Sequence, residues 1–163
     1  ILLAHPRAGE LLSPDWGESE QTFIWQDPET GIWCRSRPDT FNDDTIVDLK
    51  TTTDASPEAI SKSVWDFGYH QQQQWYRAGH NAIVGSYPEF LFIFQAKTPP
   101  YLVTVVELDQ AAELAGEERI RRARHTYAHC MRTGEWPGYG THTHQISLPP
   151  WAEKRESDER YLP

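Results

Sequence analysis

Two aspartates and a lysine in the first third of the chain have the types and spacing for metal-assisted chemistry. Asp48 and Lys50 stand two residues apart in the mostly apolar segment 45–51, and Asp39 directly follows Pro38. In a strand, residues two apart face the same side, so Asp48 and Lys50 would point together. Two converging carboxylates can hold a divalent metal, and a lysine beside them can orient a water or stabilise charge on a phosphate. Taken alone, Asp-x-Lys is common, and an exposed charge pair at a sheet edge is the more frequent interpretation.

The composition predicts one globular domain spanning residues 1–163, long enough for its own hydrophobic core. Hydrophobic residues make up 38% of the chain and aromatic residues 12%, which argues against disorder. No apolar run approaches the ~20 residues of a membrane span, and no signal peptide is visible. Only Cys34 and Cys130 are present, too few for an iron–sulfur cluster and not typical of a disulfide scaffold. These features predict a cytoplasmic protein without a membrane partner.

The formal net charge of −9 counts against a broad nucleic-acid-binding surface, which is usually basic. It does not exclude a local basic groove, because the potential follows the distribution of charges and not their sum. Acidic residues that bind metal also add to the negative count while the ion is absent.

Apolar patterning predicts an α/β fold with a mixed sheet flanked by helices. Five strands are expected: 21–26, 32–37, 45–51, 89–95 and 101–108. A helix is expected from about Glu58 to Ala78, ending at Gly79, and another from an Asp109 cap to about Arg132. A short helix within 1–12, a hairpin turn at 27–31 and a short strand at 145–148 complete the assignment. The order is β-β-β-α-β-β-α.

With its acids, lysine and helix residues in this order, the chain resembles the PD-(D/E)xK nuclease superfamily. More narrowly, it is similar to the exodeoxyribonuclease VIII (RecE-type) branch, related to phage lambda exonuclease. The motifs are Arg37-Pro38-Asp39, the segment 47–52, Gln72-x-x-x-Tyr76, the hairpin 25–31 and the ending 148–151. The resemblance covers about residues 18–152 and implies a restriction-endonuclease-like core. Several motifs in order along one chain are more specific than any one of them.

The resemblance implies a Mg²⁺ (or Mn²⁺) site. Asp39 and Asp48 would be metal ligands, with the Leu49 carbonyl oxygen as a third. Glu20 stands where related enzymes often carry a further acid, and a surface glutamate is an equally good interpretation of it. We expect both aspartates to lie within reach of one divalent ion.

The remaining site residues would act on the substrate. Lys50 would position and activate the attacking water, while Gln72 and Tyr76 would flank the site from a helix. Their spacing of four places them on one side of that helix, and we expect both to face the cleft that contains Lys50. Gln72 would also steer the lysine or the phosphate. Arg35 and Arg37 are candidates for phosphate contacts because they lie near the presumed site.

The resemblance further implies a function. The expected activity is 5′-to-3′ exonucleolytic digestion of linear duplex DNA in recombination, in a phage or prophage setting. A ring-shaped homo-oligomer that threads duplex DNA, and a single-strand-annealing protein as partner, are expected with it. The alternatives are a nuclease of this superfamily with a different DNA substrate, and a non-cleaving module that binds DNA ends or a protein.

One part of the family pattern is missing. The family usually carries a metal-binding histidine on a helix upstream of the first acid, and His5, the only candidate, has neighbours that do not fit. The expectation is that this N-terminal helical portion precedes Ile1. The stretch 141–144 (Thr-His-Thr-His) is better interpreted as a polar loop than as a metal site. The arginines at 119–124 are better interpreted as a salt-bridged helix face than as phosphate contacts.

Overall fold

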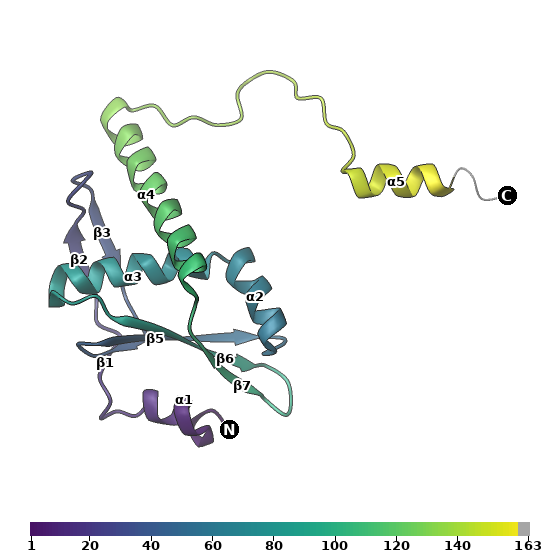
Figure 1. Ribbon diagram of the computed structural model, residues 1–163. Helices are drawn as coiled ribbons and strands as arrows, with labels where there is room; N and C mark the ends of the chain where they lie inside the picture. The colour runs from purple at the N-terminus through teal and green to yellow at the C-terminus, as the bar shows by residue number, and fades with distance from the viewer. Residues whose placement is uncertain (160–163) are drawn as a thin grey trace. The chain divides into compact units, whose positions relative to one another are not determined.

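The computed structural model describes residues 1–159 and divides the chain into two compact units, 1–133 and 134–163 (Figure 1). The first unit contains every strand of the described residues and most of the helices. Its helices and strands follow the predicted order, with short additions at the N-terminus and between the expected strands. The mixed α/β class with flanking helices is confirmed.

The main sheet has five strands in the order β1-β4-β5-β6-β7. Their bounds are β1 Glu18–Ser19, β4 Thr40–Phe41, β5 Thr45–Thr52, β6 Glu89–Ala96 and β7 Val103–Val106. Strands β5 and β6 run parallel and the other neighbours antiparallel, so the sheet is mixed. The two-residue strands β1 and β4 lie outside the expected list, because two residues carry no readable periodicity.

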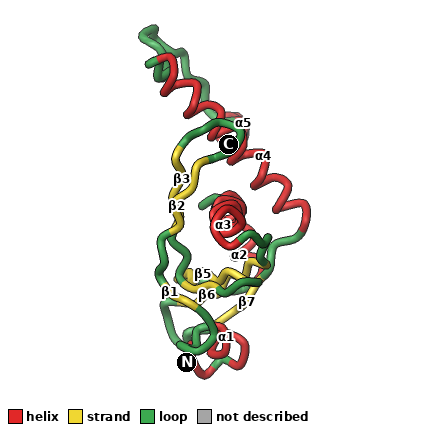
Figure 2. Tube along the Cα trace, turned by 90° about the vertical axis from the view of Figure 1, so that its left-hand side faces the viewer, coloured by secondary structure: helices red, strands yellow, loops and turns green. Residues whose placement is uncertain are grey.

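Helices cover both faces of this sheet (Figure 2). On one face, α2 (Pro57–Asp66) and α3 (Tyr69–Val84) pack over a core that contains Ile46 and three phenylalanines of β6. On the other face, α1 (Pro6–Leu11), preceded by the 3₁₀ turn η1 (Leu2–Ala4), packs against a smaller core containing Val47. Even-numbered residues of β5 therefore face α3, and odd-numbered residues face α1.

The single helix expected over 58–78 is wrong in the structure, which has two helices there. Gly68 adopts a left-handed conformation (φ 69°) between α2 and α3, and Phe67 before it is 72% exposed. The second helix also continues through Gly79 to Val84. At Gly79 the missing side chain makes room for the Trp25 ring, so this glycine serves packing and not helix termination.

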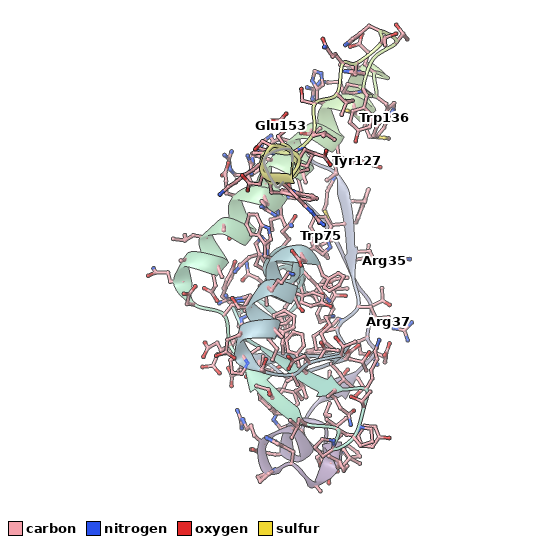
Figure 3. All side chains as sticks on the ribbon, turned by 90° about the vertical axis from the view of Figure 1, so that its right-hand side faces the viewer. Arg35, Arg37, Trp75, Tyr127, Trp136 and Glu153 are labelled. Carbon is pink, nitrogen blue, oxygen red and sulfur yellow. The ribbon has the colours of Figure 1, made fainter. Side chains whose placement is uncertain are left out.

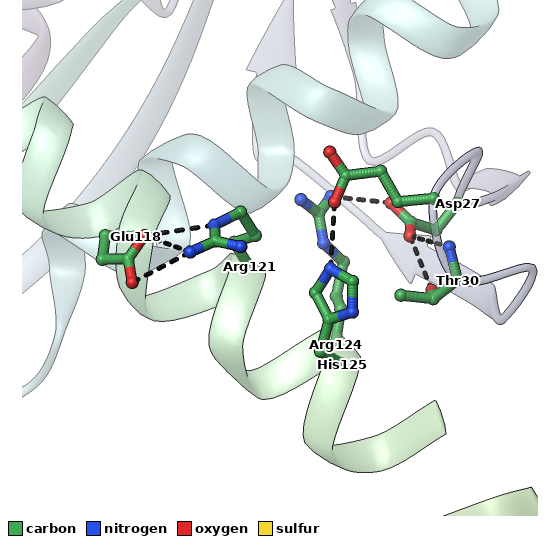
Figure 4. A network of polar contacts seen from close by, with 7 residues as sticks. Asp27, Thr30, Glu118, Arg121, Arg124 and His125 are labelled. Atoms are coloured by element: carbon green, nitrogen blue, oxygen red, sulfur yellow. Dashed lines mark hydrogen bonds and ion pairs between the residues drawn. The ribbon is translucent and has the colours of Figure 1, made fainter. Parts of the chain in front are cut away.

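Strands β2 (Phe23–Gln26) and β3 (Trp33–Ser36) form a separate two-stranded hairpin. Its turn is closed as expected, because Asp27 Oδ2 accepts from the Thr30 amide (2.9 Å) and hydroxyl (2.6 Å). The other Asp27 oxygen pairs with Arg124 at 2.9 Å (Figure 4). Arg124 belongs to α4 (Gln110–Thr133), so a nearly buried ion pair ties the hairpin to that helix.

Helix α4 begins at the expected cap, since the Ala112 amide donates to Asp109 Oδ1 at 2.8 Å. It packs closely along α3. Gln73 and Arg77 of α3 both donate to one oxygen of Glu113, at 2.7 and 2.5 Å. Other arginines of α4 make the expected ion pairs on the helix surface, such as Arg121 with Glu118 at 2.9 Å (Figure 4).

The second unit, from residue 134 onward, contains one helix in its described part, α5 (Pro150–Glu159). The strand expected at 145–148 is wrong: these residues have no strand conformation and no ladder partner among residues 1–159. The histidines of the 141–144 stretch lie in a loop, where the His144 ring contacts the Tyr139 carbonyl at 2.7 Å. Among the described residues, no helix is both long and apolar enough to cross a membrane.

The contact between α3 and α4 at Gly116 yields a stability prediction. A Cβ added at Gly116 would lie 2.1 Å from the His70 carbonyl oxygen of α3, which cannot move without shifting the helix. We expect Gly116→Ala to lower the free energy of unfolding by about 1–3 kcal/mol. This loss would oppose the gain of about 1 kcal/mol that alanine brings to a helix. Urea denaturation measures the change.

Gly138→Ala is the matched control, because a Cβ added there meets nothing within 4 Å. It should change the unfolding free energy by no more than about 0.5 kcal/mol. A stabilised Gly116→Ala protein would contradict the close helix contact.

Candidate active site

The side chain of Asp48 is the centre of the candidate site. It projects from β5 toward α3 and is only 2% exposed. Gln72 of α3 donates from Nε2 to Asp48 Oδ1 at 2.7 Å. The Lys50 ammonium forms an ion pair with Asp48 Oδ2, although that oxygen makes no hydrogen bond of good geometry. Residues from a strand and from a helix 24 positions away thus converge on one carboxylate.

Helix α3 presents three side chains to this site, at positions i, i+3 and i+7. Besides Gln72, they are Tyr69, whose ring centroid lies 5.0 Å from the Lys50 nitrogen, and Tyr76. Tyr76 also packs against Phe90 of the core, with ring centroids 6.3 Å apart. Gln72 and Tyr76 lie where their spacing predicted, while their catalytic roles stay predictions.

Asp39 lies beside Asp48 because of the sheet register. Strand β4 pairs Thr40 with Val47, and the same register carried one residue further brings Asp39 opposite Asp48. Opposite residues of an antiparallel pair share a face of the sheet. The Leu49 amide donates to Asp39 Oδ2 at 2.7 Å, so β5 itself holds this carboxylate. The two acids predicted to share a metal ion are therefore neighbours.

The electrostatics of the site are dominated by burial. Burial raises the pKa of Asp48, because a carboxylate removed from water is harder to ionise. The Lys50 ammonium and the Gln72 amide oppose this shift, and the nearby charge of Asp39 adds to it. The pKa of Tyr69 is raised by burial and by Asp48 as well.

Glu20 lies at the edge of this acidic cluster. Its amide donates to the Asp39 carbonyl at 3.1 Å, and its carboxylate pairs with Arg37 at 2.6 Å. Burial raises the pKa of Tyr76, against an opposing hydrogen bond with Gln72. Three carboxylates raise this pKa further: Asp48, Asp39 and Glu20. The charges of all three acids therefore act on the Tyr76 phenol in the same direction.

The oxygen donors of the site suit a divalent metal, but only two carboxylates are in place to hold it. Asp39 and Asp48 supply hard oxygen donors, and Asp48 Oδ2, which pairs with the Lys50 ammonium, accepts no hydrogen bond of good geometry. Among residues 1–159, no group of three or more His, Cys, Asp or Glu side chains is arranged to hold a metal. As arranged here, two carboxylates would hold the ion, and the Glu20 and Leu49 ligands stay predictions.

The two candidate phosphate contacts lie beside the site, on the hairpin and just after it. The Arg35 carbonyl accepts a hydrogen bond from the indole of Trp75 at 2.9 Å, which fixes β3 against α3. Figure 3 shows the side chains of Arg35 and Arg37 pointing away from α3, on the outer side of the hairpin. Their role in substrate binding stays a prediction.

Tyr69 was not identified from the sequence, although a signal for it existed. It stands three residues before Gln72 and seven before Tyr76, which is the spacing of one helix face. The predicted helix ran unbroken through Gly68 and gave no reason to single this tyrosine out. His5, the candidate for the family histidine, caps α1 instead by accepting from the Ala8 amide at 3.1 Å.

Comparisons with known proteins agree with this geometry. A family model described as a PDDEXK-like domain of unknown function (DUF3799) matches residues 4–148. The chain is also similar to the crystal structure of a "putative exonuclease" from Eubacterium rectale, with a TM-score of 0.61 and 13% identity. The similarity covers 80% of this chain and 55% of that one, so the chain spans about half its length. At this identity the likeness concerns the fold alone. A search of curated proteins found no match.

The buried carboxylate yields a prediction that separates stability from activity. The raised pKa of Asp48 means that the folded protein binds more protons than the unfolded chain in the interval between the ordinary and the raised value. Below the ordinary aspartate pKa of about 4, Asp48 makes its full contribution to the stability of the folded state. That contribution is lost as the pH rises through the raised pKa of the folded state. We expect Asp48→Asn to raise the thermal midpoint at pH 8 in EDTA, with a smaller gain near pH 4.

Asp43→Asn makes the same chemical change at an exposed position and is the matched control. Its midpoint should follow the wild-type curve within error across this pH range. A lower midpoint for Asp48→Asn at every pH would contradict the view that the ionised carboxylate is held at a cost to stability.

Proposed function

Because the chain belongs to the PDDEXK-like domain family DUF3799, we propose that it is a deoxyribonuclease that hydrolyses phosphodiester bonds with a divalent metal ion. The observation that carries the proposal is the convergence on Asp48. A nearly buried carboxylate contacts an ammonium two residues away and an amide from a separate helix. A buried acid with such partners in a family of nuclease-like folds is a candidate for function, because its burial costs stability.

The chain's residues would divide the work in the following way. Asp39 and Asp48 would hold Mg²⁺ or Mn²⁺, which supplies charge that polarises the scissile phosphate. Lys50, restricted by Asp48 and by the Tyr69 ring, would stabilise the negative charge that develops on the phosphate or orient the attacking water. Gln72 would hold the Asp48 carboxylate in its orientation through the 2.7 Å hydrogen bond.

For the substrate, we propose linear duplex DNA digested from an end. The proposal is supported by the resemblance of the motifs to the exodeoxyribonuclease VIII branch. The name printed for the Eubacterium rectale protein, whose fold is similar, is consistent with it. The 5′-to-3′ direction, the role in recombination, the ring-shaped oligomer and the annealing partner rest on the resemblance alone and stay predictions.

The proposal is tested by incubating the protein with end-labelled linear duplex and with closed circular duplex. Cleavage of the linear form should require Mg²⁺ or Mn²⁺, stop in EDTA and be suppressed by Ca²⁺, which holds a looser geometry. Lys50→Met keeps most of the side chain's length and removes its charge. We expect it to lower the cleavage rate by about 10²–10³-fold, as for loss of one transition-state stabiliser. DNA binding should persist, because phosphate contacts are spread over several residues.

Lys62→Met is the matched control, since Lys62 is an exposed lysine of α2, a helix that supplies none of the named site residues. It should cleave at the wild-type rate. Equal cleavage of circular and linear duplex would replace the end-directed activity with an endonuclease. Binding to DNA ends without cleavage in any of these metals would favour the non-cleaving module. Full activity of Lys50→Met would remove the proposed role of the ammonium.

A further inference from the structure

The outward face of the β2–β3 hairpin carries side chains that the proposed chemistry does not use. We define the hairpin outer face as Ile24, Trp33 and Arg35. We propose that this face binds a single-stranded segment of the nucleic acid and leads it toward the candidate active site. Trp33 would stack on a base and Arg35 would contact a phosphate. The inference rests on the proposed function and adds that the nucleic-acid substrate is single-stranded where it meets this surface.

The outer face results from strict alternation along both strands. The inward residues Phe23, Trp25 and Cys34 are at most 5% exposed, while Ile24 and Trp33 are 56% and 71% exposed. The register pairs Ile24 with Arg35, and Trp33 lies diagonally across from Ile24. An exposed tryptophan, an isoleucine and an arginine therefore gather on one side of a two-stranded ribbon.

The ribbon is fixed from its inner side, so the outer residues are not needed to hold it. The rings of Trp25 and Trp75 pack with centroids 5.5 Å apart, and the Trp75 indole donates to the Arg35 carbonyl at 2.9 Å. The Asp27–Arg124 ion pair holds the turn end. A hairpin alone is marginally stable, and these contacts make it a fixed platform. The Trp33 ring, 71% exposed on the opposite side, therefore has no part in fixing the hairpin.

The outer face leads along the chain toward the candidate active site. Trp33, Arg35 and Arg37 are exposed, and Asp39 follows at a bend beyond the end of β3, where it lies opposite Asp48. Six residues of extended chain span at most about 22 Å, so Trp33 lies within that distance of Asp39 along the backbone. A strand bound along this stretch would have one end at the aromatic residue and the other at the carboxylates.

The Arg35 and Arg37 side chains are both available to bind a phosphate. The Arg35 guanidinium makes no ion pair or hydrogen bond with the rest of residues 1–159. The Arg37–Glu20 pair is 59% and 57% exposed, and such solvated pairs contribute only about 0–1 kcal/mol. A phosphate could therefore replace Glu20 at little cost. These charges are local exceptions on a chain of net charge −9.

The chemistry of the surface favours a single strand over a duplex. Bases of a duplex are stacked on one another and cannot offer a face to Trp33, whereas an unpaired base can. Aromatic stacking combined with arginine contacts is the usual way in which proteins bind single strands without reading their sequence. The alternative occupant of this face is a second copy of the chain. The experiment below distinguishes the two.

The experiment measures binding of fluorescent oligo(dT) of about 16 nucleotides by anisotropy, in EDTA and in the Lys50→Met background, so that cleavage is absent. We expect Trp33→Ala to weaken binding about 5- to 100-fold, the range for loss of one base–aromatic stack. Trp33→Phe should recover most of the affinity. Arg35→Ala should make the slope of log K against log salt less steep by about 0.7, the value for one phosphate contact on a single strand.

Two exposed residues elsewhere are the matched controls: Trp151, which is 72% exposed on α5, and Arg122, which is 65% exposed on α4. Trp151→Ala and Arg122→Ala should bind oligo(dT) like the parent protein. The Trp33→Ala substitution should weaken binding of a blunt duplex probe less than it weakens binding of oligo(dT). Thermal unfolding of each variant checks that the fold is retained.

The outcomes separate this inference from the proposed function. Unchanged oligo(dT) binding by folded Trp33→Ala and Arg35→Ala, or no binding by the parent protein, would overturn the inference alone. A change of oligomeric state in these variants with unchanged DNA binding would also overturn it and assign the face to a contact between copies. Binding that depends on Trp33, in a protein that cleaves no DNA, would uphold the inference and refute the nuclease.

Discussion

The burial of the Asp48 carboxylate between β5 and α3 is the constraint on which the rest of the site depends. An ion removed from water loses several kcal/mol of hydration, and partners must compensate for that loss. Here they are the Lys50 ammonium and the Gln72 amide, which approach from different elements. Because a hydrogen bond tolerates only a few tenths of an ångström, α3 must lie at a defined height above the sheet. The position of one helix thus decides whether the acid is usable.

Three sets of contacts hold α3 at that height. Below it, the aromatic rings of β6 pack against Tyr69 and Tyr76. Above it, α4 approaches so closely that Gly116 lies against the His70 carbonyl. Beside it, the hairpin places Trp25 against Gly79. Close-packed contacts on three sides leave little freedom, so the site geometry is a property of the whole first unit and not of a loop.

The acidic composition is compatible with a nucleic-acid substrate because the charges are unevenly placed. Part of the excess negative charge is concentrated in the site itself, at Asp39 and Asp48, where a bound metal ion would offset it. The exposed arginines of the adjoining hairpin and the segment that follows it face outward on one side of the ribbon. A polyanion approaching this side would meet cationic side chains before it meets the acids. Net charge alone therefore says little about which molecules this surface accepts.

The features that local patterns encode were predictable from the sequence alone. Alternation along 45–52 placed Asp48 and Lys50 on one face of β5, and the Asp109 cap marked the start of α4. Both features depend only on neighbours in the chain. The pairing of Glu20 with Arg37 and the separation of the hairpin from the main sheet could not be predicted in this way.

The glycines show the physical reason for this difference. Gly68 breaks a predicted helix and Gly79 lies within one, although both are the same residue in helical surroundings. At Gly79 the helix continues, and the absence of a side chain leaves space for a tryptophan of the hairpin. At Gly68 the left-handed backbone turns the chain between α2 and α3. Such choices are made by contacts between segments far apart in the chain, which only the folded structure brings together.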